Sequence, residues 1–463
     1  MTGPYQGVRV LELGGDMATS FAGMLLADRG ADVIKYEPPA GDELRSQGAH
    51  SPGESKIFQW LGRGKRSVAL DTLTVGGRAA LIAIAHSVDV LITSWPAGAL
   101  GDLELDAATL CAARPALVFV WNQQFGSVGA WSDRASNELV LQAYSGLMAA
   151  EGKVRDDGAT PEQLTSTQVV ALPTGILMSM AVATGLWQRI ATGRGQRIDV
   201  SELQTALCVQ VSRVVDNPAA DKLRAAAQAR IAALRGQHAP HAALQAARTE
   251  AVGAPGNIFY RAFRTSDGAI FVGALSRPLR DKVRRVFDTD FLYRDDPRFD
   301  LQNPEYVAQC VAAEQRIEAL LRTRPSALWL AALEAGGVPC GDVQFAEDLA
   351  DSEHARANDY FVALVHGTDG RQLQAATPAR FSGWPAPTYA PAPAHGEHTA
   401  VVLAEIDVRL TAAVGVQRDA PAGPMVSLDK TTGALPGGGS SDSQGAIEVP
   451  PGSTPHGPTV PRG

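Results

Sequence analysis

Three cations stand close together in a short loop with the sequence GRGKRS. They are Arg63, Lys65 and Arg66. Planar guanidinium groups and a compact ammonium group both suit phosphate oxygens, so this loop is a candidate phosphate-binding site. The same residue types also make ordinary solvated basic turns, and the sequence leaves both interpretations open.

Two other polar motifs are interpreted as structural. The TGRGQ turn carries Gly193 and Gly195 between a predicted helix and a predicted strand, where glycine commonly ends a helix in a left-handed conformation. His395 and His398 in HGEHT have a spacing that could serve a metal, but their Pro-rich loop brings no third ligand nearby in the sequence. Zinc needs at least three protein ligands, so we predict no metal site.

Alternating strands and helices in the N-terminal part of the chain are expected to position these loops. Apolar runs at 8–13, 32–36, 67–70, 88–93 and 116–121 predict strands, with helices predicted after Gly15 and at 76–86. This alternation predicts an α/β fold with a parallel, Rossmann-like sheet, which binds ligands at the carboxyl ends of its strands. The loops after Leu13, Tyr36 and Thr93 are the expected ligand rim.

The remainder of the chain predicts a second, smaller α+β domain. Helices are predicted at 139–148, 172–190, 219–251, 278–287 and 305–333, a strand at 198–200, and hairpins in 257–275 and in VALVHGTDGRQLQ. We expect a large domain at 1–215, completed by 337–414, and a small domain at 252–336. Residues 420–463 lack aromatic side chains and are rich in Pro, Gly, Ser and Thr, which predicts a disordered tail.

Composition narrows the class of partner. The chain has 463 residues, 45% of them apolar, and a formal net charge of -8, which argues against a nucleic-acid binder and favours small soluble partners. Cys111, Cys208, Cys310 and Cys340 form no CxxC pair, as expected of a reduced protein. The N-terminus shows no signal peptide, and polar and Gly residues interrupt the apolar stretch 169–187, so we expect a cytoplasmic protein without a membrane span.

Five segments together resemble one enzyme family. GVRVLELGG, ADVIKYEPP, GRGKRSVALD, NELVLQAYSGLM and the stretch 172–202 occur in the order found in the CaiB/BaiF, or family III, CoA-transferases. The resemblance covers residues 7–414. It implies an interlocked dimer of two-domain chains with the active site between the domains, and transfer of CoA from an acyl donor to a carboxylate acceptor. CoA would be the carrier, with no metal.

The resemblance also points to one altered position. The family carries an aspartate four residues before the glycine that matches Gly175, and this aspartate accepts the acyl group. Ala171 stands there in this chain. A methyl group cannot form the acyl-enzyme anhydride that makes the exchange possible, so the family's usual covalent route lacks its nucleophile.

Glu138 is the candidate replacement, because family members carry Asp or Glu at the matching position, lining the same site. Racemase relatives place a His-Asp pair where this chain has Asn137 and Glu138, and a glutamate of the second domain near Ser276. Both racemase bases are therefore altered or absent. The alternative interpretation of Glu138 is a hydrogen-bonded structural acid or a helix-end residue.

The coenzyme site can be carried over in part. Met17 and Ala18 match family positions that contact the nucleotide end of CoA, and a helix N-terminus there could receive phosphate oxygens. Arg63, Lys65 and Arg66 would then meet the 3'-phosphate and the pyrophosphate. Pro38 and Ser94 depart from the family pattern at positions where a transferase carries a cation and an asparagine.

Three functions follow as alternatives. The first is a nucleophile-deficient subunit that pairs with an active homologous chain. The second is an active CoA-transferase or racemase-like enzyme that uses Glu138, or a carboxylate from the loop Arg155-Asp156-Asp157. The third is a noncatalytic acyl-CoA-binding protein.

Overall fold

The computed structural model describes most of the chain up to residue 406. The described residues are 3–48, 54–150, 153–157, 160–217, 222–252, 258–300, 303–367, 369–384, 387 and 389–406. All of them belong to the compact unit Met1–Val416, and the predicted tail at 420–463 lies outside them.

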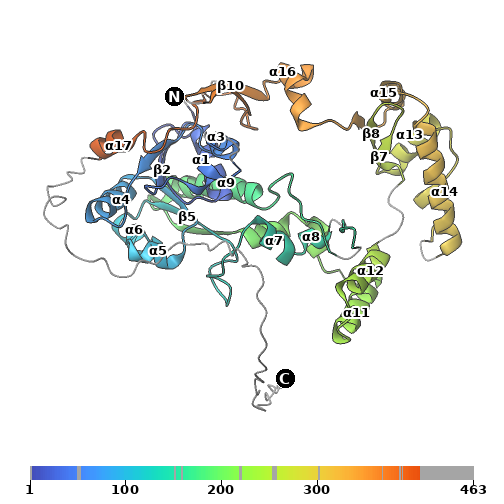
Figure 1. Ribbon diagram of the computed structural model, residues 1–463, viewed down its shortest axis with the longest axis horizontal. Coiled ribbons are helices and arrows are strands. Elements are labelled where there is room, and N and C mark those ends of the chain that lie inside the picture. The colour runs from blue at the N-terminus through green and yellow to red at the C-terminus, as the bar shows by residue number, and fades with distance from the viewer. Residues whose placement is uncertain are drawn as a thin grey trace, which may run out of the picture. The chain divides into compact units, whose positions relative to one another are not determined.

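A six-stranded sheet organises the N-terminal half (Figure 1). Its order is β3-β2-β1-β4-β5-β6, and every neighbouring pair is parallel. The strands are β1 (Arg9–Leu13), β2 (Asp32–Glu37), β3 (Arg66–Ala69), β4 (Val90–Thr93), β5 (Val118–Gln123) and β6 (Arg197–Ser201). The predicted α/β class with a Rossmann-like parallel sheet is confirmed.

Helices cover both faces of this sheet. Successive strand residues point to opposite sides, and because both sides are apolar, each face packs against helices. Val118 and Val120 share one core cluster with helices α1 (Met17–Ala27) and α9 (Ala171–Thr192). Phe119 lies in the cluster of the other face, with helices α4, α5, α6 and α17. Those four helices are Val75–Ser87, Ala97–Asp102, Ala107–Ala113 and Thr399–Glu405.

Helices α1 and α9 approach each other closely at one glycine. A Cβ atom added to Gly175 would lie 2.7 Å from the Ala18 carbonyl oxygen and 3.0 Å from the Phe21 side chain. Only a residue without a side chain allows this approach, so Gly175 holds the beginnings of α1 and α9 together.

A three-stranded antiparallel sheet, β7-β8-β9, forms the core of the small α+β part. Its strands are Tyr260–Arg264, Ala269–Gly273 and Cys340–Asp342, and helices α13 (Arg277–Val286), α14 (Pro304–Leu321) and α15 (Ser326–Ala335) accompany them. The predicted hairpin around Ser266-Asp267-Gly268 is confirmed by the antiparallel pairing of β7 with β8. One sequence expectation was wrong here, because the helix predicted at 305–333 is broken before Pro325. Strand β9, which follows residue 336, pairs with β8.

The remaining elements lie between these strands and helices in the chain or follow them. They are α2 (Glu43–Ser46), α3 (Lys56–Leu61), α7 (Glu138–Tyr144), α8 (Leu147–Ala150), α10 (Glu202–Cys208), η1 (Val211–Val214), α11 (Lys222–Gly236), α12 (His241–Val252), η2 (Tyr293–Asp295), η3 (Ala346–Asp351), α16 (Glu353–Ala357) and the hairpin β10 (Phe361–His366) with β11 (Gly370–Ala375). Among the described residues, none of the helices is long and apolar enough to cross a membrane.

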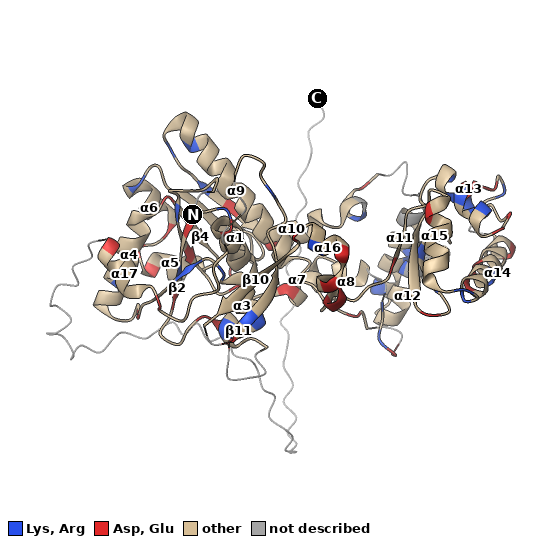
Figure 2. Ribbon diagram, turned by 90° about the horizontal axis from the view of Figure 1, so that it is seen from above, with Lys and Arg blue, Asp and Glu red and all other residues tan. Residues whose placement is uncertain are grey.

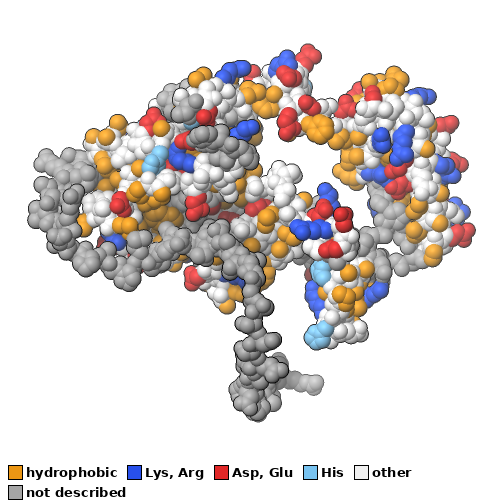
Figure 3. Space-filling model, in the orientation of Figure 1, with side chains coloured by type: hydrophobic (Ala, Val, Ile, Leu, Met, Phe, Trp, Pro, Cys, Tyr) orange, Lys and Arg blue, Asp and Glu red, His pale blue; other side chains and the backbone are white. Residues whose placement is uncertain are grey.

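Charge is spread over the described elements. Figure 2 shows basic and acidic segments interspersed on the ribbon, and Figure 3 shows charged side chains alternating with hydrophobic ones over the visible face.

Candidate active site at three helix N-termini

Ala171 is the first residue of helix α9, and its side chain is buried at 7% exposure. The residue before it, Val170, has no side chain that can cap the helix. The first amide groups of a helix lack partners within the helix and must find them elsewhere. The beginning of α9 therefore needs an acceptor from another part of the chain.

Glu138 supplies that acceptor. Its Oε2 accepts hydrogen bonds from the Ala171 amide at 2.9 Å and the Val170 amide at 3.3 Å, while its Oε1 lies 3.1 Å from the Val170 amide. Buried Gln142 donates to Oε1 at 2.8 Å. The structure thus brings the candidate carboxylate and the altered nucleophile position into direct contact, and it gives Glu138 a capping role on α9.

Helix α1 begins beside helix α9. Its capping residue is Asp16, whose Oδ1 accepts a hydrogen bond from the Thr19 amide at 2.8 Å. Met17 is half-buried, and Ala18 is fully buried against Gly175. A CoA phosphate at this N-terminus would have to share it with the Asp16 carboxylate, and the contact of Met17 and Ala18 with CoA stays a prediction.

A third helix, α10, starts at the end of β6 and joins the same region. Asn122 of β5 donates from Nδ2 to Glu202 Oε1 at 2.7 Å and to Asp16 Oδ1 at 3.4 Å. Glu202 is the first residue of α10 and is buried. Three helix N-termini therefore each hold a carboxylate at the carboxyl end of the parallel sheet, where the topology predicts ligand binding.

The cations of the GRGKRS loop are engaged inside the protein. Arg63 is 1% exposed, pairs with Asp28 at 2.6 Å and donates to the Ala375 carbonyl at 2.6 Å. Arg66 is half-buried, and it pairs with Asp32 at 2.6 Å and with Glu405 at 2.8 Å. The alternative interpretation of this loop as a solvated basic turn is wrong for Arg63, because its guanidinium group is buried and paired with a carboxylate. Contact of Arg63 and Arg66 with CoA phosphates would require these pairs to open, and it stays a prediction.

Lys65 belongs to a buried charge cluster on the α1 side of the sheet. Its Nζ pairs with Glu12 at 2.7 Å, and Lys35 pairs with Glu12 at 2.9 Å and with Asp42 at 2.6 Å. Burial lowers the pKa of Lys65 to about 8, with the neighbouring Lys35 charge adding to the effect and Glu12 opposing it. Lys65 is therefore a structural cation in this arrangement, and its predicted role towards CoA also remains open.

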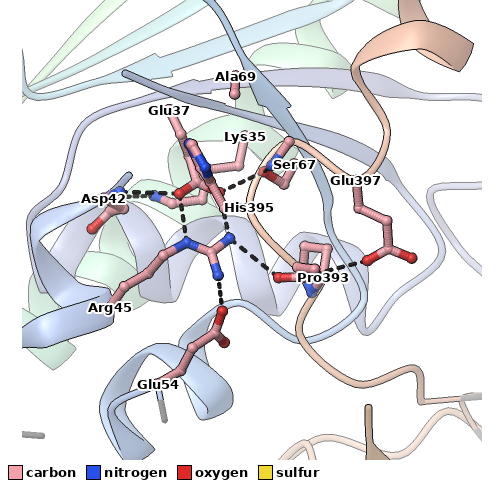
Figure 4. Close-up of polar contacts among 12 residues, drawn as sticks. Lys35, Glu37, Asp42, Arg45, Glu54, Ser67, Ala69, Pro393, His395 and Glu397 are labelled. Carbon is pink, nitrogen blue, oxygen red and sulfur yellow. Dashed lines mark hydrogen bonds and ion pairs between the residues drawn. The ribbon is translucent and has the colours of Figure 1, made fainter. Parts of the chain in front are cut away.

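Arg45 links the N-terminal strands to the C-terminal segment (Figure 4). It forms paired hydrogen bonds with Glu37 at 2.6 Å, pairs with Glu54, and donates to the Pro393 carbonyl at 3.1 Å. Its hydrogen bonds to Glu37 hold the pKa of that carboxyl below its usual value, although burial acts in the opposite direction. This network fixes the loop after β2, one side of the predicted ligand rim.

One of the two motifs interpreted as structural is confirmed as a helix cap. Gly193 ends α9 in a left-handed conformation with φ of 69°, which confirms the predicted cap. His395 lies 3.0 Å from the Pro38 carbonyl through Nε2. Among the described residues there is no group of three or more His, Cys, Asp or Glu side chains placed to hold a metal ion. Asp157, from the alternative carboxylate loop, accepts a hydrogen bond from the Thr160 amide at 2.8 Å.

The family model described as CoA-transferase family III matches residues 5–399, nearly the whole described chain. The chain belongs to CoA-transferase family III. The mouse succinyl-CoA:glutarate CoA-transferase is 28% identical to this family III chain, with 87% of this chain and 86% of the relative covered. The acetyl-CoA:oxalate CoA-transferase of Acetobacter aceti is 27% identical, over 83% of this chain and 91% of the relative.

Solved structures agree with the family III fold. The crystal structure of a CAIB/BAIF family protein from Brucella suis has a TM-score of 0.67 and 24% identity, and it covers 88% of this chain and 100% of that chain. A structure of a Mycobacterium tuberculosis protein, Rv3272, has a TM-score of 0.68 and 23% identity, over 87% and 99%. These similarities support the fold.

Sequence reasoning missed three residues of this family III site. They are Asp16, Asn122 and Glu202, which are hydrogen-bonded to one another although 106 positions separate Asp16 from Asn122 and 80 separate Asn122 from Glu202. Only Asp16 left a local signal, because an aspartate just before a helical segment is a common capping residue. Asn122 and Glu202 could be found only after the strands and helices were placed.

Proposed function

We propose that this chain is a nucleophile-deficient family III CoA-transferase subunit. It acts on acyl-CoA and carboxylate pairs together with a homologous chain that carries the catalytic aspartate. The observation that carries the proposal is Ala171, which begins α9 beside Glu138 where the resemblance puts the nucleophile. A methyl group offers no oxygen for acyl transfer, while the rest of the fold is retained.

The capping role of Glu138 supports this proposal. Two backbone amides and Gln142 donate to its carboxylate. These hydrogen bonds occupy lone pairs on both carboxylate oxygens, which makes the lone pairs less available for attack. For Glu138 to act as the nucleophile, α9 would have to give up its cap, so we favour the capping role.

The outward side of α9 supports the proposed pairing. Ile176, Met180, Trp187 and Ile190 are exposed by 52%, 58%, 75% and 80%. Their spacing puts them on one side of the helix. Large exposed apolar side chains in a row mark interaction surfaces more often than free surface. We therefore propose a dimer, either of two copies or with a homologous chain, with CoA as the carried group.

The proposed location is the cytoplasm. Cys111, Cys208, Cys310 and Cys340 are all free thiols in the structure, which fits a reducing compartment.

A mixing experiment tests the proposed function. The purified chain alone should transfer no CoA between an acyl-CoA and a carboxylate, and transfer should appear when a homologous chain with the aspartate is folded with it. The control is the homologous chain alone, whose own rate must be subtracted. Full activity of the lone chain would overturn the proposal.

A second candidate is an active enzyme that uses Glu138, favoured by the direct contact of its carboxylate with the start of α9. It predicts a glutamyl thioester that borohydride or hydroxylamine traps, and that disappears in the Glu138→Gln variant. A third candidate is a noncatalytic acyl-CoA-binding protein. It predicts that calorimetry detects the binding of CoA while activity assays detect no turnover.

A further inference from the structure

Asn122 occupies an unusual place for an amide side chain. It continues the row Val118, Val120 on the face of the sheet that α1 and α9 cover, and it is only 2% exposed. Its Nδ2 spends both hydrogens on carboxylates, at 2.7 Å from Glu202 Oε1 and 3.4 Å from Asp16 Oδ1. An apolar residue at this position would pack in the same way as Val118 and Val120. We therefore ascribe the amide to the hydrogen bonds that it forms.

The acceptor side of this cluster is incomplete. Asn122 Oδ1 and Asp16 Oδ2 are buried atoms that have no hydrogen-bond partner among the described residues. Buried polar atoms in native proteins nearly always have partners, and an unpaired one is unfavourable. Both atoms are acceptors, so the missing partner is a group that donates hydrogen bonds.

The cluster lies beside the altered nucleophile position. Val120, Ala18 and Ala171 belong to one buried cluster, and Asn122 follows Val120 towards the carboxyl end of β5. Asp16 directly precedes α1, whose first turn contacts α9 at Gly175. A thioester brought to Ala171 would therefore have its acyl group close to Asn122 and Asp16.

The charge around this position is negative. Asp16, Glu138 and Glu202 stand at the N-termini of α1, α9 and α10, where a substrate carboxylate would otherwise gain from the helix dipole. Lys35 reaches the Gly14 carbonyl at 3.0 Å, but it is already paired with Glu12 and Asp42. A free carboxylate on the acyl group would be repelled by these charges. The N-termini of α1, α9 and α10 already hold carboxylates and would not stabilise it.

From these contacts we infer that Asn122, Asp16 and Glu202 select the acyl group: Asn122 Oδ1 and Asp16 Oδ2 accept hydrogen bonds from a hydroxyl or amino substituent, and the negative charges of Asp16 and Glu202 exclude a distal carboxylate. This inference rests on the proposed function, because it assumes that a CoA thioester binds at Ala171. It separates this chain from relatives whose names include the dicarboxylates glutarate and oxalate as CoA acceptors.

Calorimetry on the full-length protein tests the inference with four probes. They are CoA, butyryl-CoA, 3-hydroxybutyryl-CoA and succinyl-CoA. The hydroxyl compound should bind about tenfold more tightly than butyryl-CoA, because a site built to accept a hydroxyl hydrogen leaves acceptors unpaired when that hydroxyl is missing. Succinyl-CoA should bind about tenfold more weakly than butyryl-CoA, because its carboxylate meets like charges.

Two variants assign the effect to residues. Asn122→Leu removes the amide at similar volume and should reduce the preference for the hydroxyl compound to about twofold or less. Glu202→Gln keeps a partner for Asn122 and removes one charge, so it should strengthen the binding of succinyl-CoA relative to that of butyryl-CoA severalfold. The matched control is Asp199→Asn on neighbouring β6, where the side chain is exposed and pairs with Arg197. If Asn122→Leu does not fold, Glu202→Gln alone decides the charge half of the inference.

The outcomes distinguish the inference from the proposed function. Failure of all four probes to bind overturns both. Binding of CoA with equal affinity for the three acyl compounds overturns the inference alone. Equal weakening of CoA itself and of all three thioesters in Asn122→Leu also overturns it, because the amide would then serve the pantetheine chain.

Discussion

At the scale of single residues, the site depends on where carboxylates are held. Glu138 was recognisable from its residue type and its place in NELVLQAYSGLM. Its hydrogen bonds to Val170 and Ala171 were not, because they join residues 32 and 33 positions apart. Residue identity therefore predicted a candidate, and only the fold showed that the candidate caps α9.

Removing that cap should weaken the protein. We expect Glu138→Ala to lower the free energy of unfolding by about 1 kcal/mol, since loss of a helix cap typically costs about 0.5–2 kcal/mol. Chemical denaturation followed by circular dichroism measures the change. Glu43→Ala, at an exposed glutamate in the first turn of α2, is the control. Equal stability of Glu138→Ala and the wild type would contradict the capping role.

Asp295 should make the part of the fold around β7, β8 and β9 sensitive to acid. Hydrogen bonds from Arg280 and Arg284 lower the pKa of Asp295 to about 2 from 3.8. A lowered carboxyl pKa adds stability above pH 3.8, and this contribution disappears as the pH falls from 3.8 towards 2. We expect Asp295→Asn to be less stable at pH 7 by about 3 kcal/mol, because the buried Arg280 loses its carboxylate partner and Arg284 keeps only Asp281.

The pH profile separates this effect from a general loss of packing. Thermal unfolding measured between pH 7 and pH 2 should show a smaller fall for Asp295→Asn than for the wild type. Parallel profiles would show that another group is responsible.

At the scale of elements, the packing of α1 on α9 places Asp16 near Ala171. We expect Gly175→Ala to lower the free energy of unfolding by about 1–3 kcal/mol, because the added methyl would lie 2.7 Å from the Ala18 carbonyl oxygen. Gly101→Ala in α5 is the control, since nothing lies within 4 Å of its added carbon. The control should be neutral or slightly stabilising, by up to about 1 kcal/mol. Denaturant titration measures both, and an equally neutral Gly175→Ala would refute the close approach.

Element prediction worked where local patterns repeat. The parallel strands and the helices between them could be predicted because apolar runs alternate with amphipathic segments. The short helix α3 escaped prediction because it lacks a long periodic pattern. Strand β9 escaped it because three residues are too few to show alternation, and its pairing with β8 is a tertiary contact.

At the scale of the whole molecule, the apolar side of α9 should govern assembly. We expect Trp187→Glu to shift the protein from dimer towards monomer by at least about tenfold in the dissociation constant, because a charge would replace a large apolar contact. Sedimentation velocity across a dilution series measures the shift. Thr192→Glu, at the exposed end of the same helix, is the control. A monomeric wild type, or a dimer unaffected by Trp187→Glu, would contradict the proposed surface.

Whole-molecule arrangement was the least predictable level. The meeting of Asp16, Asn122 and Glu202 depends on strand order, which brings β1 and β5 to either side of β4. The pairing of Arg63 with Asp28 likewise depends on a loop folding back over α1. Sequence patterns predict the elements, but the charges that decide chemistry meet only through such long-range contacts.

Helix α17, the last helix of the described residues, has a consequence for biosynthesis. Glu405 pairs with Arg9 and Arg66 at 2.8 Å each, and the Thr399 hydroxyl accepts the Ala69 amide hydrogen at 3.0 Å. Strands β1 and β3 thus receive these partners only after ribosomes have made almost all of the described chain. During synthesis, the N-terminal half of the chain therefore exposes the part of the sheet that α17 later covers. We expect chaperones to bind this surface before the ribosome releases the chain.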